Sequence, residues 1–139
     1  MKKVFVDTVY WIAIANPKDQ WRQAAEDARE QLGNARLVTT EEVLTEFLTA
    51  LSKRPRLRDI VVRVVRGILG NPNVKVIPQS RDSFQRGLRR YEERPDKGYS
   101  LQDCISMNAM DSESITEILT NDHHFEQDGY TVLMKRNTS

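Results

Sequence analysis

The chain has 139 residues, of which 39% are hydrophobic and 29% are charged, and its formal net charge is +1. This composition is typical of a globular protein, and the length predicts one domain over residues 1–139 with a substantial hydrophobic core. No apolar run approaches the roughly 20 residues that cross a bilayer, so we expect no membrane-spanning helix and no membrane partner.

Apolar runs that alternate with helical patterns define the expected elements. Short, partly β-branched runs predict strands at residues 3–8, 36–39, 74–77, 115–120 and 130–133. Apolar residues that recur on one face predict helices at residues 8–14, 18–32, 40–52, 57–69, 80–93 and 100–110. A short turn or helix is expected at 122–127, and a polar tail follows residue 133.

This alternation favours an α/β fold, a three-layer α/β/α sandwich around a central parallel sheet of about five strands. The N-terminus also has features of a signal peptide, but Asp7 interrupts its apolar stretch and the positions beyond it form a helical face. Cys104 is the single cysteine, so no internal disulfide can form. We therefore expect a protein of the reducing cytoplasm.

Three aspartates occupy equivalent places in the pattern. Asp7 ends the first strand, Asp122 follows the fourth strand, and Asp103 lies in the first turn of the helix that begins at Ser100. Taken singly, each favours a helix-capping role, and Ser100 with Asp103 has the form of a capping box. Taken together, they place three carboxylates at the edge of a parallel sheet where ligands bind, and their mutual repulsion calls for a cation.

A fourth acid is expected on the helix after the second strand, where three glutamates compete. On a helical wheel Glu42 points away from the apolar stripe, so we expect it to be the most solvated of the three. Glu41 and Glu46 lie at opposite edges of the stripe. The wheel does not choose between them.

The acids fall in four segments that resemble the motifs of PIN-domain nucleases, and by length the small VapC-like ribonuclease toxins. The four segments are Phe5–Trp11, Thr39–Glu46, Ser100–Cys104 and Leu119–Phe125. Each motif alone is weak, but the ordered set spans nearly the whole chain. The resemblance implies an acidic catalytic site and selects Glu46 over Glu41. The implied site consists of Asp7, Glu46, Asp103 and Asp122, with Thr8 and Thr120 as supporting hydroxyl residues.

Oxygen ligands without a cysteine–histidine cluster suit Mg²⁺ or Mn²⁺. We expect Asp7, Asp103 and Asp122 to hold the metal, while Glu46 completes the coordination sphere or orients the nucleophile. Such a site can activate water for phosphodiester hydrolysis. The resemblance further implies single-stranded RNA as the substrate, a small antitoxin protein as a partner, and a homodimer.

Two basic stretches are candidates for RNA contacts. The first comprises Lys53, Arg54, Arg56, Arg58, Arg63 and Arg66, of which Arg54, Arg56 and Arg58 are the leading candidates. The second comprises Arg86, Arg89, Arg90 and Arg94. Basic residues near the site would bind phosphates. Both stretches are equally consistent with solvated helix faces, with Asp59, Glu92 and Glu93 as local partners.

Several other side chains have a structural and a functional interpretation. Adjacent His123 and His124 cannot share one helical face, so we expect them at the surface or behind the metal ligands. Trp11 and Trp21 occupy apolar helical positions, which favours a place in the core or an interface over base stacking. Cys104 has no apparent partner base and is expected to be a small buried residue.

Other functions are open to a chain with this pattern. A receiver-type phosphoacceptor would need an acid after the third strand, but Val76–Gln79 contains none. A phosphohydrolase with Asp7 as nucleophile would need a second aspartate two positions on, where Val9 stands. A PIN-domain RNA-processing nuclease that is not a toxin stays an alternative. The complete set of acids disfavours a non-catalytic interaction module.

Overall fold

A five-stranded parallel sheet forms the centre of the computed structural model, which describes residues 1–136. The strands are β1 (Lys3–Val6), β2 (Arg36–Thr40), β3 (Val74–Ile77), β4 (Glu117–Leu119) and β5 (Thr131–Val132). Their order is β3-β2-β1-β4-β5, and every pair of neighbours is parallel. The chain thus grows outward from β1 in both directions. The crevice at such a reversal of strand order is where open α/β sheets bind ligands.

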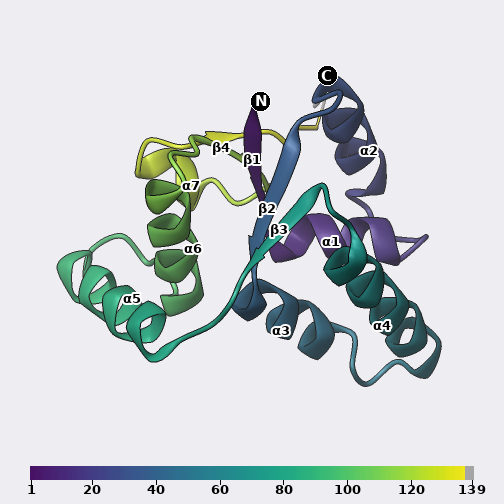
Figure 1. Cartoon of the computed structure of the whole chain (residues 1–139), viewed down its shortest axis with the longest axis horizontal. Coiled ribbons are helices and arrows are strands. Elements are labelled where there is room, and N and C mark those ends of the chain that lie inside the picture. The colour runs from purple at the N-terminus through teal and green to yellow at the C-terminus, as the bar shows by residue number, and fades with distance from the viewer. Residues whose placement is uncertain (137–139) are drawn as a thin grey trace.

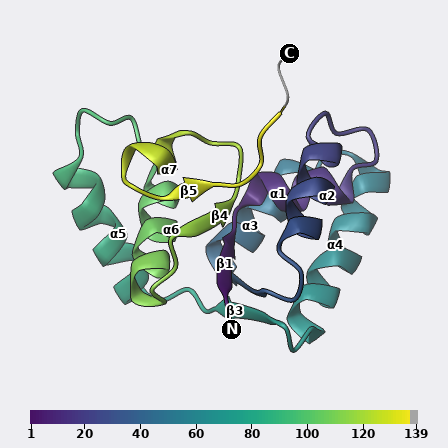
Figure 2. The same ribbon diagram turned by 90° about the horizontal axis from the view of Figure 1, so that it is seen from above.

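Helices cover both faces of this sheet. They are α1 (Thr8–Ala15), α2 (Arg22–Gln31), α3 (Glu41–Ala50), α4 (Pro55–Gly70), α5 (Arg81–Glu93), α6 (Leu101–Ser112) and α7 (His124–Gln127). Helices α1 to α4 lie on one side of the sheet and α5 to α7 on the other, with α5 outermost (Figures 1 and 2). The predicted three-layer α/β/α sandwich is confirmed. Among the described residues, no helix combines the length and apolar character needed to span a bilayer.

The core extends over both faces of β1, whose Val4, Phe5 and Val6 are fully buried. Burial on both faces explains why this strand is a continuous apolar run rather than an alternating one. Trp11 belongs to the core, whereas Trp21 is half-buried and stacks beneath the Arg136 guanidinium at 4.1 Å. The expectation of structural roles for both tryptophans agrees with these positions.

Several boundaries differ from those expected. Helix α2 begins at Arg22 rather than residue 18, because Asn16 Oδ1 accepts the Lys18 N–H and Asp19 Oδ1 accepts the Trp21 N–H, which holds this segment in turns. Helix α4 begins two residues early, at Pro55, a favoured first helical residue.

The last two strands are shorter than predicted. The segment before β4 is a turn in which the Ile115 N–H donates to the Met110 carbonyl, so the strand begins only at Glu117. Strand β5 comprises Thr131–Val132 alone. The end of the predicted polar tail, residues 137–139, lies outside the described residues.

Candidate active site

The four predicted acids line one cleft at the carboxyl edge of the sheet. Its volume is about 630 Å³, and its walls include Asp7, Glu46, Asp103 and Asp122. These side chains come from the end of β1, the middle of α3, the first turn of α6 and the segment after β4. The parallel arrangement of β1 and β4 brings acids that are distant in sequence to the same edge.

Asp7 is the most enclosed of these acids, with 7% of its surface exposed. It occupies the N-cap position before α1, but its side chain does not form the usual capping hydrogen bond to the second or third residue of that helix. Its Oδ2 instead accepts a hydrogen bond of 2.8 Å from Oγ1 of Thr120, the residue that directly follows β4. Asp7 and Thr120, both among the predicted site residues, are thus joined by a direct hydrogen bond.

The surroundings of Asp7 disfavour its charge in the absence of a cation. Burial raises the pKa of Asp7 to about 7, although hydrogen bonds from Thr120 and the Thr8 backbone oppose the shift, and the charges of Asp103 and Glu46 add to it. A divalent cation placed among these carboxylates would reverse the balance in favour of the ionised form.

Asp103 caps helix α6 and also lines the cleft. Its backbone N–H donates to Ser100 Oγ and its Oδ2 accepts the Ser100 N–H, both at 3.0 Å, so the predicted capping box is confirmed. Burial raises the pKa of Asp103, and the nearby charge of Asp122 adds to the shift. The capping bonds hold the side chain in one orientation at the edge of the cleft.

Asp122 brings a histidine into the site. Its Oδ1 accepts the His124 backbone N–H at 2.9 Å and lies 2.9 Å from His124 Nδ1. One ligand atom each from Asp103, Asp122 and His124 lie within 4.8 Å of one another. His124 was not among the predicted site residues, although its position two residues after Asp122 was a usable signal, since aspartate often bonds the backbone two residues on.

Only one of the two histidines lines the cleft. His124 is half-buried there, with its ring edge-on to Tyr99 at 5.8 Å, whereas His123 is exposed and stacks on its outer side. The expectation that adjacent histidines cannot serve the same face is consistent with this arrangement.

Glu46 is the glutamate that lines the cleft, where its Oε1 accepts a hydrogen bond from the Thr8 hydroxyl. Glu41 instead accepts the Gln79 backbone N–H at 2.8 Å, outside the cleft lining. The expectation that Glu42 is the most solvated of the three is wrong. Glu42 is half-buried and accepts a hydrogen bond of 2.8 Å from Ser83 Oγ, because the start of α5 packs over that side of α3.

The basic residues that are the leading candidates for RNA contacts lie outside the cleft. Arg54, Arg56 and Arg58 are exposed around the start of α4, and none of them is among the described residues that line the cleft. Arg58 donates to the Ser52 carbonyl at 3.1 Å, which ties it to the end of the preceding loop. Cys104 is fully buried, and burial raises the pKa of its thiol, in keeping with the structural role predicted for it.

The donor set fits a hard divalent cation. Carboxylate oxygens dominate the cleft and one imidazole stands at its rim, a combination suited to Mg²⁺ or Mn²⁺. The charges of Asp103 and Glu46 add to the raised pKa of Asp7, which is the electrostatic condition that a bound cation would relieve.

Two solved structures have a fold similar to that of this chain. VapC20 of Mycobacterium tuberculosis, described as a toxin that cleaves the sarcin–ricin loop, superposes with a TM-score of 0.82 at 23% identity, over 92% of this chain and 96% of that one. VapBC2 of Rickettsia felis, solved with a DNA fragment from its promoter, superposes with a TM-score of 0.67 at 16% identity, over 94% and 96%. At these identities the likeness concerns the fold. No curated protein matches the sequence.

Family membership follows from the sequence itself. The model of the PIN domain matches residues 4–128, a range that contains strands β1 to β4, apart from Lys3 at the start of β1, and every helix described above. The same range contains each of the acids that the sheet brings to the cleft. This chain is therefore a member of the PIN domain family.

Proposed function

We propose that the chain is a metal-dependent endoribonuclease that hydrolyses phosphodiester bonds of single-stranded RNA, and that it is the toxin of a type II toxin–antitoxin pair in the cytoplasm. The single observation that carries this proposal is the convergence of four acids on one cleft, with the buried Asp7 at its base. In this proposal residues 1–139 form one catalytic domain that works as a homodimer.

The three aspartates share one proposed role, and Glu46 has another. Asp7, Asp103 and Asp122 hold Mg²⁺ or Mn²⁺, with His124 at hydrogen-bond distance from Asp122. When bound, the cation acidifies water and offsets the negative charge that develops on the phosphodiester. Glu46, oriented by the Thr8 hydroxyl, completes the coordination or aligns the attacking water.

The protein's contribution to the reaction is mainly positioning. The Thr120 hydroxyl and the Ser100 capping box fix the carboxylates of Asp7 and Asp103 before substrate arrives. Such preorganisation lowers the barrier because little rearrangement accompanies the reaction. Water then attacks phosphorus, one P–O bond of the RNA backbone breaks, and the oxygen that leaves takes up a proton.

The fold likeness supports the choice of substrate and partner. VapC20 is described as a toxin that cleaves the sarcin–ricin loop, and VapBC2 was solved with a DNA fragment from its promoter. By analogy, a small antitoxin protein would bind this chain and block the cleft. A PIN-domain nuclease that processes RNA without acting as a toxin would use the same acids, so only a biological assay separates the two.

The central test measures cleavage of tRNA, rRNA and mRNA pools by purified protein with Mg²⁺, with Mn²⁺ or in EDTA. The Asp7→Asn variant should lose more activity than the roughly 10–100-fold loss typical of outer-sphere changes, because it removes a direct ligand. Asp59→Asn on the exposed side of α4 is the matched control and should cleave normally. Full activity in EDTA, or in Asp7→Asn, contradicts the proposed chemistry.

The toxin assignment needs a separate assay. Expression of the wild-type chain should arrest growth, and co-expression of a small partner encoded immediately upstream should restore it. Asp7→Asn should be harmless. Soluble, active protein that leaves growth unaffected would favour the RNA-processing alternative.

A further inference from the structure

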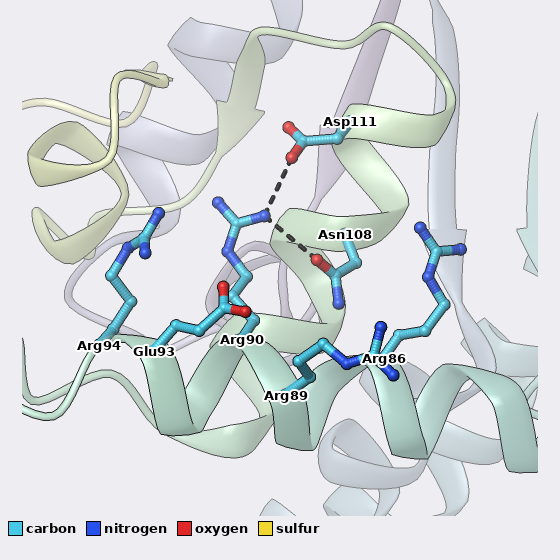
Figure 3. A pocket seen from close by; sticks show the side chains of 7 residues that line it. All are labelled: Arg86, Arg89, Arg90, Glu93, Arg94, Asn108 and Asp111. Carbon is cyan, nitrogen blue, oxygen red and sulfur yellow. Dashed lines mark hydrogen bonds and ion pairs between the residues drawn. The ribbon is translucent and has the colours of Figure 1, made fainter.

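A second pocket, of about 310 Å³, lies between α5 and α6, apart from the acidic cleft. Figure 3 shows Arg86, Arg90 and Arg94 rising from the same face of α5, with Arg89 beside them and Asn108 of α6 opposite. The two carboxylates that also line the pocket are Glu93 and Asp111, so cations are in excess. These arginines belong to the second basic stretch of the sequence.

The charges of Arg90 and Arg94 are already paired with carboxylates of the protein. Arg90 forms ion pairs with Asp111 at 2.9 Å and with Asp128, and it donates to the Tyr130 hydroxyl at 3.1 Å. Burial opposes the charge of Arg90, but its bonds to Asp111 and Asp128 outweigh burial and raise its pKa. Arg94 also pairs with Asp128, at 3.4 Å. This network ties α5 and α6 to the segment between α7 and β5.

Two buried donors in the pocket have no acceptor within the described part of the chain. They are Nε of Arg90 and Nδ2 of Asn108. Asn108 Oδ1 accepts from Arg90 at 3.1 Å, and this bond turns Nδ2 towards α5, between Arg90 and Arg86 (Figure 3). A buried donor without an acceptor destabilises the protein, so a ligand that supplies acceptor oxygens here would relieve that cost.

Two cations beside these donors are free to bind a ligand. Among residues 1–136, the side chain of Arg86 has only an exposed ion pair with Asp82 at 3.9 Å, of a kind that contributes little to stability. Arg89 is exposed and has no side-chain hydrogen bond or ion pair to any of residues 1–136. Guanidinium groups and neutral N–H donors around one pocket form the recognition chemistry of a phosphate group.

The connection between α5 and α6 joins this pocket to the cleft. Arg94 lines the pocket, and Gly98 and Ser100, a few residues on, line the cleft. Helix α6 carries Asp103 at the cleft and Asn108 at the pocket, five residues apart, which corresponds to about 7.5 Å of helix rise. Five residues also turn about 140° around the helix axis, so a nucleic-acid strand held in the cleft would reach the pocket by passing over the start of α6.

We propose that the pocket between α5 and α6 binds a backbone phosphate of the RNA substrate, outside the cleft, through Arg86, Arg89 and the Nδ2 of Asn108. The proposal rests on the proposed ribonuclease function and assigns it a second substrate contact. It shifts the site of RNA binding away from Arg54, Arg56 and Arg58 to the other side of the molecule (Figure 1).

Two variants isolate this contact. Arg86→Ala/Arg89→Ala removes both free cations. Asn108→Asp keeps an acceptor for Arg90 and replaces the donor by a carboxylate that repels phosphate. The matched control, Lys18→Ala/Arg36→Ala, removes the same charge from exposed positions outside the pocket lining. Thermal unfolding of each variant checks that α5 still packs on α6.

The measurement is fluorescence anisotropy of a labelled single-stranded RNA of about 20 nucleotides in EDTA, over a salt series, beside KM and kcat for its cleavage with Mg²⁺. Relative to the control, the double arginine variant should bind about 10-fold more weakly, and its slope of log Kobs against log[salt] should fall by about 1.4, for two lost phosphate contacts. KM should rise with kcat unchanged. An RNA of about 4 nucleotides, too short to leave the cleft, should show no difference.

Each alternative outcome is distinct. If the arginine variant and Asn108→Asp match the control in affinity, KM and salt slope, the phosphate site is wrong while the ribonuclease function stands, provided that Asp7→Asn is inactive. If inorganic phosphate alone saturates the pocket without displacing RNA, the pocket binds a free anion instead. Loss of binding to an acidic peptide, with RNA binding intact, would assign the pocket to a protein partner and overturn the proposal. Absence of RNA binding by wild-type protein overturns both proposals.

Discussion

Thr120 and Asp7 are 113 positions apart in the chain, yet the Thr120 hydroxyl donates a hydrogen bond of 2.8 Å to the Asp7 carboxylate. The contact exists because β1 and β4 are adjacent and parallel, with Val6 paired to Leu119 directly before the two residues. It joins the end of β1 to the segment after β4, which both contribute acids to the cleft.

Replacing Thr120 by valine tests this link. Thr120→Val leaves a buried carboxylate oxygen without its donor, so we expect the free energy of unfolding to fall by about 1–3 kcal/mol at neutral pH. Loss of a second-sphere partner should also weaken Mn²⁺ binding about 10–100-fold in calorimetric titration. Thr120→Ser retains the hydroxyl and should preserve both quantities; a Thr120→Ser variant as impaired as Thr120→Val would show that the hydroxyl is not sufficient and contradict this role.

Divalent cations should stabilise the fold. A Mn²⁺ concentration about 100-fold above its Kd should raise the free energy of unfolding by about 2.7 kcal/mol, because the ion binds the native cleft selectively. EDTA should reverse the effect, and Asp122→Asn should greatly reduce it. If Asp122→Asn gains as much stability as wild type, the ion binds elsewhere.

Glu46 and Glu41, both on α3, provide a matched pair of test positions. Glu46→Gln should lower kcat without unfolding the protein, because Glu46 lines the cleft and its side chain is exposed. Glu41→Gln should leave kcat unchanged, since Glu41 binds the Gln79 backbone outside the cleft. Circular dichroism confirms folding in each case. A loss of activity in Glu41→Gln equal to that in Glu46→Gln would contradict the assignment.

Gly87 permits the close approach of α5 and α6. A Cβ at this position would lie 2.5 Å from Ile105 Cγ1, so a neighbouring element must shift. We expect Gly87→Ala to destabilise the protein by about 1–3 kcal/mol in urea, despite the better helix propensity of alanine. Gly67→Ala in α4 is the control: its Cβ meets nothing within 4 Å, and the change should stabilise by up to about 1 kcal/mol.

Glu113 should make stability depend on pH. Hydrogen bonds from Lys75, at 2.8 Å, and from Lys3, at 3.3 Å, lower the pKa of Glu113 below its ordinary value of 4.5, although burial opposes the shift. The charged form is therefore favoured by the fold, and its contribution is complete above the ordinary pKa and lost as pH falls through the folded one.

The comparison of wild type with Glu113→Gln isolates this effect. At pH about 7 the variant should be less stable by about 1 kcal/mol, a magnitude typical of partly exposed ion pairs. The difference should shrink as the pH falls below the ordinary pKa of glutamate, because Glu113 then becomes protonated and neutral like glutamine. Urea unfolding at a series of pH values measures it; a difference independent of pH would exclude an ionic origin.

Much of the fold followed from local patterns, because local chemistry specifies local structure. The buried run Val4–Val6 reads as a strand covered on both faces, and the box of Ser100 with Asp103 starts α6 as predicted. The places of Asp7, Asp103 and Asp122 at strand ends and a helix start also follow from sequence. Their convergence requires only that parallel strands share one carboxyl edge.

The tertiary structure decided what depends on neighbours from distant parts of the chain. A helical wheel gives the direction of Glu42 from its helix axis, but only the fold shows that α5 covers it. The same holds for Glu46, whose Oε1 accepts a hydrogen bond from Thr8 of α1. It holds equally for Arg90, whose carboxylate partners come from α6 and beyond α7. Periodicity and spacing contain no information about such contacts, because the groups that satisfy a charge lie 18 to 41 residues or more away along the chain.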